Sequence, residues 1–573
     1  MVRPISSESI LARLGRQSEK RLTTRDLRAA VLFFLGRYTG RMKRQLLLKV
    51  QCAILLIAAV LAAAETKKSK SFTPTHDIRV KTVKTLIKEV RQAKPGTEIV
   101  LAAGEYALQS DLNVSARGSE AEPVVIRAAQ VGKTLITKGA ISFNDASWVT
   151  LEGITIKTTP KDGEALISVN NSEHIRISRI NFQISGDADT DYVSLEDAQD
   201  IQVDRCDFGK RAGKGNYVHV ARPSSRVRID HNYFHDRNKV EGNGGESISL
   251  HGQHGHRWDM DTVIEHNLFE NVDGEWEMIG IKSHQNIVRH NTFINCSGAI
   301  SIRGGDYNTI YSNYFLNFSE KPTAAVRIHG AYNKVINNYA SGLTTSFIET
   351  NWGDTSIPYI SRNDRIKWWG EHSDVESYAI QETGYRRTTA NTIAFNTIID
   401  STSLFRWIQK SLVPFEQLPP KKAPWVDASK DRVIYPPDHW TVANNLVVDV
   451  GDFIVEESRN RGDMPFTEAA AIHEKDFTWI GNAIFSKSGA VDYGEGRTFQ
   501  TKEWRIQKQA LEQTSVPGLF ETAPKLSSTR FRPTLGEADD DLSEVRRLLG
   551  STEIGASLAA PPLTADAVGP DAP

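Results

Sequence analysis

The chain has 573 residues, of which 39% are hydrophobic, so it is long enough to bury a large core. Its net charge of −1 is unevenly spread, since residues 1–64 hold 12 Lys and Arg against 3 Asp and Glu, whereas the remainder holds 57 against 67. The acidic remainder excludes a general nucleic-acid binder, and an anionic partner would have to meet a local basic cleft.

The N-terminal segment, residues 1–64, resembles a secretory signal with an extension in front of it. Met42-Lys43-Arg44 begins a basic stretch, and an apolar run from Ala53 to Ala64 ends in small residues. We expect Met42 to be the natural start. The apolar run is short for a membrane span, so we expect a secreted or periplasmic protein without stable membrane insertion after cleavage. An uncleaved anchor is the alternative.

Three cysteines are too few for a disulfide framework. Cys52 falls in the signal, and Cys206 and Cys296 lie 90 residues apart without zinc-ligand spacing around them. We interpret the latter two as small buried residues.

A short helix and a strand open the mature chain. Apolar residues recur at helical spacing between Val80 and Val90, and Pro95-Gly96 ends that run. Glu98–Leu101 is expected to be a strand, followed by a turn at Gly104–Tyr106. A helix in this place would cap the first coil of a repeat fold, whose edge would otherwise be open.

A repeat follows, in which Asn or Asp stands one or two residues before an apolar residue. The steps from Asn181 are 26, 25, 35, 24, 22 and 25 residues, followed by steps of 58, 49 and 37. We interpret the steps of 58 and 49 as two coils each and the step of 37 as one coil with an insertion. The repeated Asn or Asp residues are Asn181, Asp207, Asn232, Asn267, Asn291, Asn313, Asn338, Asn396, Asn445 and Asn482.

A period in the low twenties with β-branched and aromatic residues predicts a parallel β-helix. Asn suits left-handed turns and stacks into hydrogen-bonded ladders, so these residues are structural. The predicted fold is all-β: a right-handed parallel β-helix with an N-terminal capping helix and long side loops. The β-helix is expected over 72–500, and residues 501–573 form a C-terminal segment that packs on it or trails from it. Leucine-rich repeats are disfavoured because their Leu-x-x-Leu-x-Leu pattern is absent.

The step of 35 residues after Asn232 is about ten residues too long for one coil, and extra residues in a solenoid form side loops, which often carry function. This loop contains Gly242–Glu246. Further long loops are expected at Thr345–Thr388 and Leu412–Trp425.

An acidic pair follows that loop. In a strand Glu275 and Glu277 would share the outward face, with Trp276 turned the other way. Such a pair is either a solvated acidic pair or a site for a hard cation such as Ca²⁺ or Mg²⁺.

Two cations stand near the acidic pair. Strict alternation puts Lys282 on the face opposite Glu277, so a bulge near Gly280 is needed to bring it round. Arg303 lies 21 residues after Lys282, close to one coil, and is expected to stack beside it.

These residues resemble polysaccharide lyase family 6, which includes alginate lyases and chondroitinase B. The resemblance rests on Glu275-x-Glu277-x4-Lys282-Ser283 with Arg303 after it, and on the closing segment Leu563–Pro570. It implies that Asn243, Glu275 and Glu277 bind Ca²⁺, with Glu246 a weaker match than Asn243. It further implies that Lys282 is the catalytic base and Arg303 the acid or leaving-group stabiliser. Gly304 follows Arg303 where the family would have His, which removes an auxiliary acid there.

The resemblance predicts a lyase that cleaves an anionic uronate polysaccharide by Ca²⁺-assisted β-elimination, acting as a monomer. Alginate is the expected substrate, with dermatan sulfate the alternative. Residues expected to bind the substrate are Arg327, His329, Trp352, Arg362 and Arg365.

Two other functions remain open. A glycoside hydrolase would need paired carboxylates at a set separation, and a strand pair at 275 and 277 is too close for inversion. A non-catalytic glycan-binding β-helix is the second.

Overall fold

The computed structural model describes residues 73–351 except 222, 251–258 and 319–323. Beyond 351 it describes 388–410, 437–448, 450, 452–459, 477–480, 482–485, 504–506, 556 and 562–571. The predicted signal, most of the two later loops and most of the segment 501–573 lie outside these residues. Among the helices described, none has the length and apolar character needed to cross a membrane.

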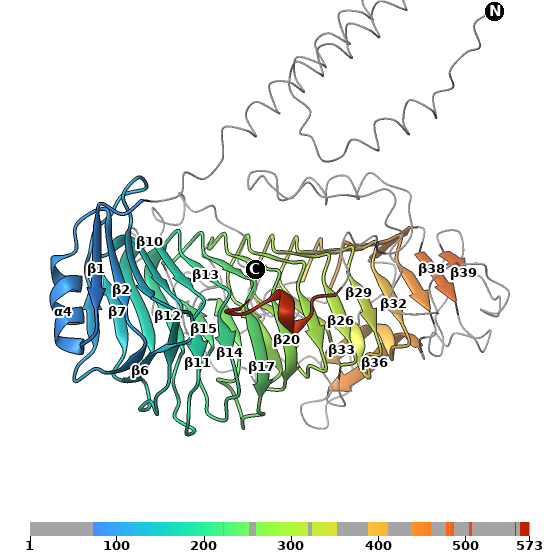
Figure 1. Ribbon diagram of the computed structural model, residues 1–573. Helices are drawn as coiled ribbons and strands as arrows, with labels where there is room; N and C mark the ends of the chain where they lie inside the picture. The colour runs from blue at the N-terminus through green and yellow to red at the C-terminus, as the bar shows by residue number, and fades with distance from the viewer. Residues whose placement is uncertain are drawn as a thin grey trace, which may run out of the picture. The chain divides into compact units, whose positions relative to one another are not determined.

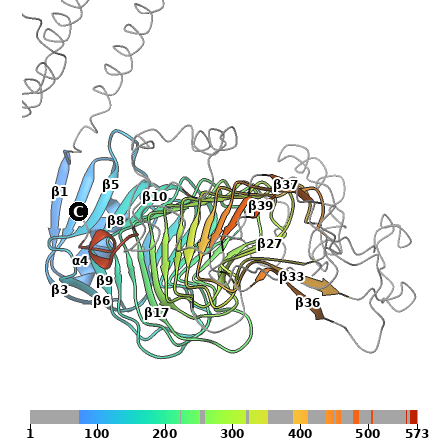
Figure 2. The same cartoon turned by 90° about the vertical axis from the view of Figure 1, so that its right-hand side faces the viewer.

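The described residues form a parallel β-helix, which confirms the predicted fold (Figure 1). Every pair of strands in it is parallel, and each coil contributes a strand to a first row, then to a second row, then to a second sheet. The two rows are joined in one 25-stranded sheet, and the second sheet has 14 strands among the described residues. Turned by 90°, the ribbon shows the coils stacked one behind another (Figure 2).

The first row contains β4 (Leu112–Val114), β7 (Ile141–Asn144), the start of β10 (Ile167–Ser178), β12 (Val193–Gln199), β15 (Val218–Val220), β18 (Ile248–Leu250), β21 (Glu277–Ile281), β24 (Ala299–Arg303), β27 (Val326–His329), β30 (Ser346–Asn351), β33 (Ser403–Lys410) and β36 (Asp452–Arg459). The second row contains β1 (His76–Val80), β2 (Thr97–Leu101), β5 (Val124–Ala128), β8 (Ser147–Glu152), the end of β10, β13 (Gln202–Asp204), β16 (Arg228–Asp230), β19 (Val263–Glu265), β22 (Ile287–Arg289), β25 (Thr309–Tyr311), β28 (Lys334–Ile336), β31 (Thr392–Ala394), β34 (Trp440–Ala443) and β37 (Phe477–Ile480). The second sheet contains β3 (Gly104–Ala107), β6 (Thr134–Lys138), β9 (Ile154–Ile156), β11 (Asn181–Phe182), β14 (Asp207–Phe208), β17 (Tyr233–Arg237), β20 (Leu268–Val272), β23 (Thr292–Ile294), β26 (Tyr314–Leu316), β29 (Tyr339–Ser341), β32 (Thr397–Ile399), β35 (Leu446–Val448), β38 (Asn482–Phe485) and β39 (Trp504–Ile506).

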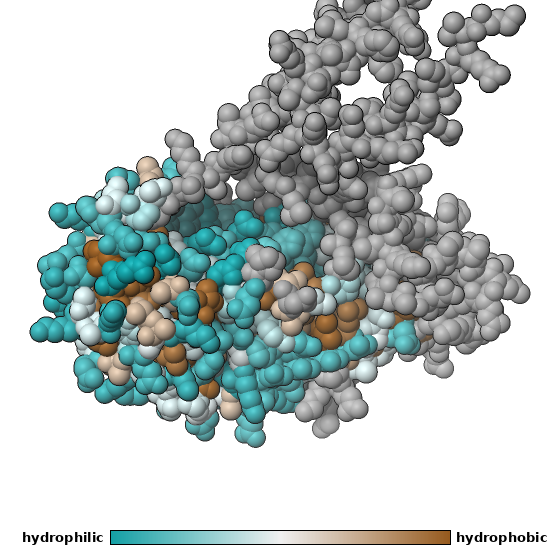
Figure 3. Space-filling model, viewed as in Figure 1, coloured by the Kyte–Doolittle hydropathy of each residue, from teal (hydrophilic) through white to brown (hydrophobic). Residues whose placement is uncertain are grey.

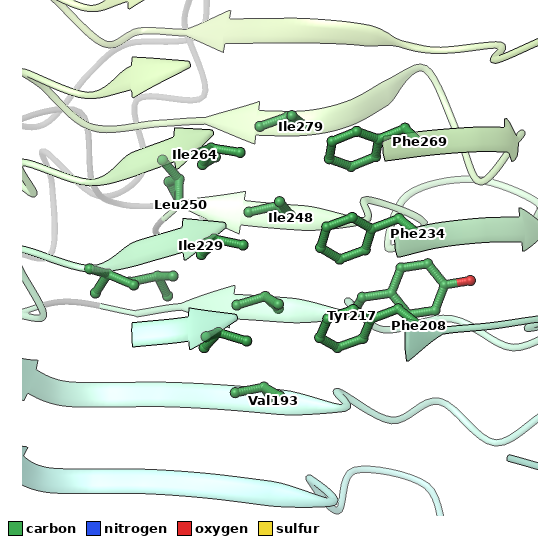
Figure 4. Close-up of a cluster of buried hydrophobic side chains, with 14 of the residues drawn as sticks. Val193, Phe208, Tyr217, Ile229, Phe234, Ile248, Leu250, Ile264, Phe269 and Ile279 are labelled. Atoms are coloured by element: carbon green, nitrogen blue, oxygen red, sulfur yellow. The ribbon is translucent and has the colours of Figure 1, made fainter. Parts of the chain in front are cut away.

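Stacked side chains of the same kind fill the interior (Figure 4). Phe208, Phe234 and Phe269 lie on successive coils with ring centroids 4.7 and 4.6 Å apart. Ile248 and Ile279 occupy the matching position in the first row. Since alternate residues point inward, the residues between them face outward, and this alternation decides which polar side chains can form a site.

The asparagine ladder is present from Asn232 onward. The backbone N–H and side-chain amide of Asn232 donate to Oδ1 of Asn267 at 2.9 and 3.0 Å, and the pattern repeats along the solenoid. Asn181 and Asp207 are not members, because Asp207 pairs with Tyr233, one residue past the ladder position. The left-handed backbone conformation that was predicted for the ladder Asn is found in the residue before it. His231, for example, has a φ of 57°.

The prediction that the steps of 58 and 49 residues contain two coils each was wrong, whereas the prediction of one coil with an insertion for the step of 37 is confirmed. Asn338 donates directly to Asn396, Asn396 to Asn445 and Asn445 to Asn482. Each of these intervals is therefore a single coil with a long insertion between strands.

A helix near the start of the described residues and a segment near their end both pack against coils of the solenoid. Helix α4 (Val83–Gln92) packs on the first coils through Leu86 and Val90, as predicted for a cap, and Thr82 caps its N-terminus. The C-terminal residues 562–571, with a short 3₁₀ helix η6 (Ala565–Ala567), lie over the second sheet (Figure 1).

The C-terminal segment is held by backbone contacts with that sheet. The N–H of Leu563 donates to Thr292 Oγ1 at 2.8 Å, and the N–H of Gly569 donates to the His231 carbonyl at 2.9 Å. The face that carries this segment is largely hydrophilic, with hydrophobic side chains in separate patches (Figure 3).

Cys206 and Cys296 are free and buried, as expected from the sequence. Burial raises the pKa of both thiols.

Candidate active site

The first row carries a column of outward-facing residues across consecutive coils. Its register runs Ser249–Gly280–Ser301–Arg327–Glu349. A second outward column lies two residues further along each strand, where Arg303 pairs with His329 and Lys282 follows Ile281, the partner of Ile302. Lys282 and Arg303 therefore occupy neighbouring coils of one face, as the spacing of 21 residues predicted.

A β-bulge brings Lys282 to that face. The register of β21 against β24 shifts between Glu277 and Ile279, so one residue is gained at Met278. The sequence required such a bulge, but it lies before Gly280 and not at it. Strand β21 begins only at Glu277, so Glu275 and Trp276 belong to the preceding bend and Trp276 is exposed instead of turned inward.

Three carboxylates meet beside this bulge. Glu246, Glu275 and Glu277 are all buried. Burial, the charge of Glu246 and a hydrogen bond to Glu246 raise the pKa of Glu275 to about 8, and Glu277 adds to the effect. Near neutral pH, without another positive charge, Glu275 therefore keeps its proton.

Lys282 is the cation nearest to Glu246. Its Nζ lies 3.2 Å from Glu246 Oε1, and both side chains are 10% exposed. Burial opposes ionisation of Glu246, but the charge of Lys282 and the hydrogen bond from Glu275 outweigh it and lower the pKa of Glu246. This ion pair holds Lys282 beside the carboxylate cluster.

Arginines approach the cluster from the following coils. Oε1 of Glu277 lies 3.6 Å from Arg303 and 3.3 Å from Arg327. Arg327 also lies 3.3 Å from Glu349, which in turn contacts Arg406 at 3.0 Å. Arg303 is the more accessible of the two arginines at Glu277, with its side chain 33% exposed against 13% for Arg327.

Glycine leaves space between the carboxylates. A Cβ built on Gly280 would lie 3.4 Å from both Glu246 Cγ and Glu277 Oε2. That Oε2 is buried and has no hydrogen-bond partner. The small residue thus lets two acidic side chains face each other over the strand.

A buried arginine holds the loop that carries Glu246. Nε of Arg237 donates to the Gly245 carbonyl at 2.7 Å, and Arg237 lies against the Tyr217 ring at 5.0 Å. The sequence analysis missed this role, because nothing in the sequence distinguishes a buried arginine in this turn from a surface one.

Some predicted residues lie elsewhere. Asn243 is exposed between two left-handed glycines, and Glu246 stands beside Glu275 in its place, so a ligand role for Asn243 stays a prediction. His329 follows the column of Arg303 and is fully buried, and its role in binding a sugar stays a prediction. Trp352, Arg362 and Arg365 lie outside the described residues.

The three carboxylates offer the donor atoms that a hard cation prefers, but they are not arranged around a common point. Within the described ranges, no group of three or more His, Cys, Asp or Glu side chains is placed to hold a metal ion. Yet the cluster offers only oxygen donors, and among the described residues the buried Oε2 of Glu277 has no hydrogen-bond partner. Oxygen donors of this kind are those that Ca²⁺ binds, and a Ca²⁺ site at Glu246, Glu275 and Glu277 stays a prediction.

Comparison with known proteins supports this region as the functional one. The family model of Chondroitinase B matches residues 80–352, a range that includes the three carboxylates, Lys282, Arg303 and Arg327. No curated protein sequence matches the chain.

Solved structures share the fold at low identity. A mutant of the alginate lyase AlyGC, of family PL6, is 19% identical with a TM-score of 0.62, and the match covers 86% of this chain and 58% of that one. A mannuronic acid-specific family 6 lyase from human gut microbiota is 20% identical with a TM-score of 0.57, covering 76% and 90%. A PL6 polysaccharide lyase from Pseudopedobacter saltans is 19% identical with a TM-score of 0.53, covering 76% and 97%.

This chain thus spans little more than half the length of AlyGC. The resemblance indicated by the sequence motifs is confirmed: residues 80–352 form a chondroitinase B-like region, and the chain resembles polysaccharide lyase family 6.

Proposed function

We propose that the chain is a secreted or periplasmic polysaccharide lyase that cleaves an anionic uronate polymer by β-elimination. The observation that carries the proposal is the placement of Lys282 and Arg303 on neighbouring coils, beside three buried carboxylates on one outer face. A β-elimination needs a base for the C5 proton and a group that stabilises the leaving oxygen. This face offers one of each.

Lys282 is assigned as the base. Its amine takes the proton from C5, and the C–H electron pair forms the C4–C5 double bond. The C4–O bond breaks with its electrons on the departing oxygen, which is protonated by Arg303 or by a water that Arg303 orients. Arg303 suits this place because its side chain is the more exposed of the two arginines at Glu277.

Glu246, Glu275 and Glu277 would hold Ca²⁺, with Asn243 added if its loop moves inward. When bound, the ion neutralises the uronate carboxylate and stabilises the negative charge that develops next to C5. The residues themselves position the reaction: Arg237 fixes the loop of Glu246, and Arg303 with Arg327 fixes Oε1 of Glu277.

Alginate is the proposed substrate, because the solved structures with this fold reported above include an alginate lyase and a mannuronic acid-specific lyase. Dermatan sulfate is the second candidate, because the family model that matches is Chondroitinase B. A glycoside hydrolase is disfavoured, because Glu246 and Glu275 are hydrogen-bonded to each other, closer than the ~5 Å of a retaining pair.

The test is a substrate panel. The purified protein is incubated with alginate, polymannuronate, polyguluronate and dermatan sulfate, with and without a calcium chelator, and unsaturated product is measured by ultraviolet absorbance. We expect absorbance from one class of polymer and its loss in chelator. Absence of unsaturated product from every polymer in the presence of Ca²⁺ would contradict the proposal.

A further inference from the structure

One exposed aromatic residue, Trp276, stands in the chain between two residues of the carboxylate cluster. Trp276 is 48% exposed, although Glu275 and Glu277 on either side of it are buried. No ring stack or cation–π contact to Trp276 occurs among the described residues. The other exposed aromatics of the described chain, Tyr307 and Tyr332, stack on each other with centroids 4.8 Å apart.

The backbone that carries this indole is held by its neighbouring coils. The Trp276 carbonyl accepts from the N–H of Ala299 at 3.0 Å, and the Gly274 carbonyl accepts from the N–H of Val240 at 2.9 Å. A Cβ on Gly298 would lie 2.8 Å from the Glu275 carbonyl, so this bend is also tightly packed. The indole is therefore presented by a fixed scaffold, which lowers the entropy cost of binding a ligand.

The surroundings indicate what the indole would bind. Single exposed hydrophobic residues are common and by themselves carry no meaning. Trp276 differs because it sits between two carboxylates of the cluster, while Lys282 and Arg303 lie on the same row. A ligand that reaches these cations must carry negative charge, and one that covers an indole must offer an apolar face. A uronate ring has both, in its carboxylate and its C–H face.

We infer that Trp276 is a sugar-stacking residue that binds one ring of the anionic polysaccharide beside the carboxylate cluster. The inference rests on the proposed function and deepens it, because it adds a binding residue to the site. Tryptophan contributes large contact area with few rotatable bonds, which is why it dominates many binding sites. Its loss therefore weakens binding more than it slows the chemical step.

Binding is measured in the Lys282→Ala background, where substrate is not consumed. Oligosaccharides from the polymer that the panel selects are titrated by calorimetry. We expect Trp276→Ala to weaken binding about tenfold or more and Trp276→Phe by only about two- to threefold, since phenylalanine keeps a ring. In the otherwise wild-type protein, Trp276→Ala should raise KM by a similar factor and change kcat little.

Tryptophan fluorescence distinguishes a role of Trp276 in binding from a purely structural role. Oligosaccharide should change the tryptophan emission of Lys282→Ala and of its Trp148→Phe derivative, but not of its Trp276→Phe derivative. Trp148 is the matched control, because it stacks on His174 at 3.9 Å in a distant coil. Thermal unfolding of each variant checks that the fold is intact.

The outcomes separate this inference from the function it rests on. If a polymer is cleaved and Trp276→Ala leaves KM, affinity and the emission change as they were, the inference is overturned while the lyase stands. If no polymer is cleaved but uronate oligosaccharides bind and require Trp276, the lyase proposal fails and the inference holds. If neither cleavage nor binding occurs, both are overturned.

Discussion

The two rows of the large sheet carry acidic and basic residues at the same coil spacing, yet they use them differently. On the second row Arg176 lies 2.7 Å from Asp204, and Arg289 lies 2.6 Å from Glu265, which Arg228 also contacts at 2.7 Å. Each of these buried carboxylates is matched by at least one arginine.

On the first row the matching is incomplete. Glu246 and Glu275 are hydrogen-bonded to each other, the pKa of Glu275 is raised to about 8, and Oε2 of Glu277 has no hydrogen-bond partner. Carboxylates that are paired with arginine stabilise stacked coils, whereas Glu275 faces other carboxylates and lowers stability when it is ionised, unless a bound cation offsets its charge. The same residue types are therefore structural on one row and candidate functional groups on the other.

The largest effect on activity is expected from removing the residue assigned as the base. Lys282→Ala should reduce unsaturated-product formation by about 10³-fold, because it removes the group assigned to take the C5 proton. Initial rates from ultraviolet absorbance measure it. The matched control is Arg228→Gln on the second row, which should retain the wild-type rate; equal losses in the two variants would mean that the rows do not differ in function.

Filling the space over Gly280 should have the next largest effect. Gly280→Val places branched carbon between Glu246 and Glu277, so we expect about a 10²-fold lower rate and a weaker response to Ca²⁺. Ser168→Val tests a position of the same outward column in a remote coil, where the rate should not change. Calcium titrations of activity compare the two, and a Gly280→Val variant with normal calcium response would argue against a cation between these carboxylates.

The raised pKa of Glu275 predicts a pH effect on stability in chelator. Because the folded-state pKa is about 8, above the ordinary value, the contribution of Glu275 is full below about pH 4.5 and is lost as pH rises through about 8. Glu275→Gln stays neutral and escapes this loss, which is about 3 kcal/mol over the two pH units between about 6 and about 8. Melting temperatures at about pH 6 and about pH 9 should therefore differ less in Glu275→Gln than in the wild type. Glu164→Gln, exposed and distant, should follow the wild type.

The smallest effect on activity is expected from a substitution on the second row. Asp204→Asn leaves Arg176 and Arg205 without their carboxylate, and we expect a loss of about 1–2 kcal/mol in the free energy of unfolding, reduced by the partial exposure of both arginines. Denaturant unfolding measures the loss, and the rate of the folded variant should match the wild type. A large rate loss in a folded Asp204→Asn variant would contradict the division between the rows.

Much of the fold was predictable because it repeats. The spacing of asparagines and the phenylalanines beside them indicated stacked coils, and the apolar spacing from Val80 to Val90 indicated the cap. Coil counts after Asn338 were wrong, because an insertion of about one coil's length cannot be distinguished in sequence from a coil.

The site was predictable in its residues more than in its geometry. The alternation of inward and outward residues showed that a bulge was needed to bring Lys282 to the outer face. The position of that bulge depends on how β21 pairs with β18 and β24, which lie on other coils. The place of Glu246 beside Glu275 depends on a glycine-rich loop held by Arg237, a contact with no sequence signal. Trp276 was expected to face inward because β21 was assumed to begin earlier than it does.

The most direct test compares two products of the same reaction. Polymer is treated with the protein in Ca²⁺, and new reducing ends and new C4–C5 double bonds are both counted over time. The account predicts one double bond for each reducing end, with both absent from Lys282→Ala. Reducing ends without double bonds would show hydrolysis, and a Lys282→Ala variant that still forms double bonds would show that this row does not hold the base.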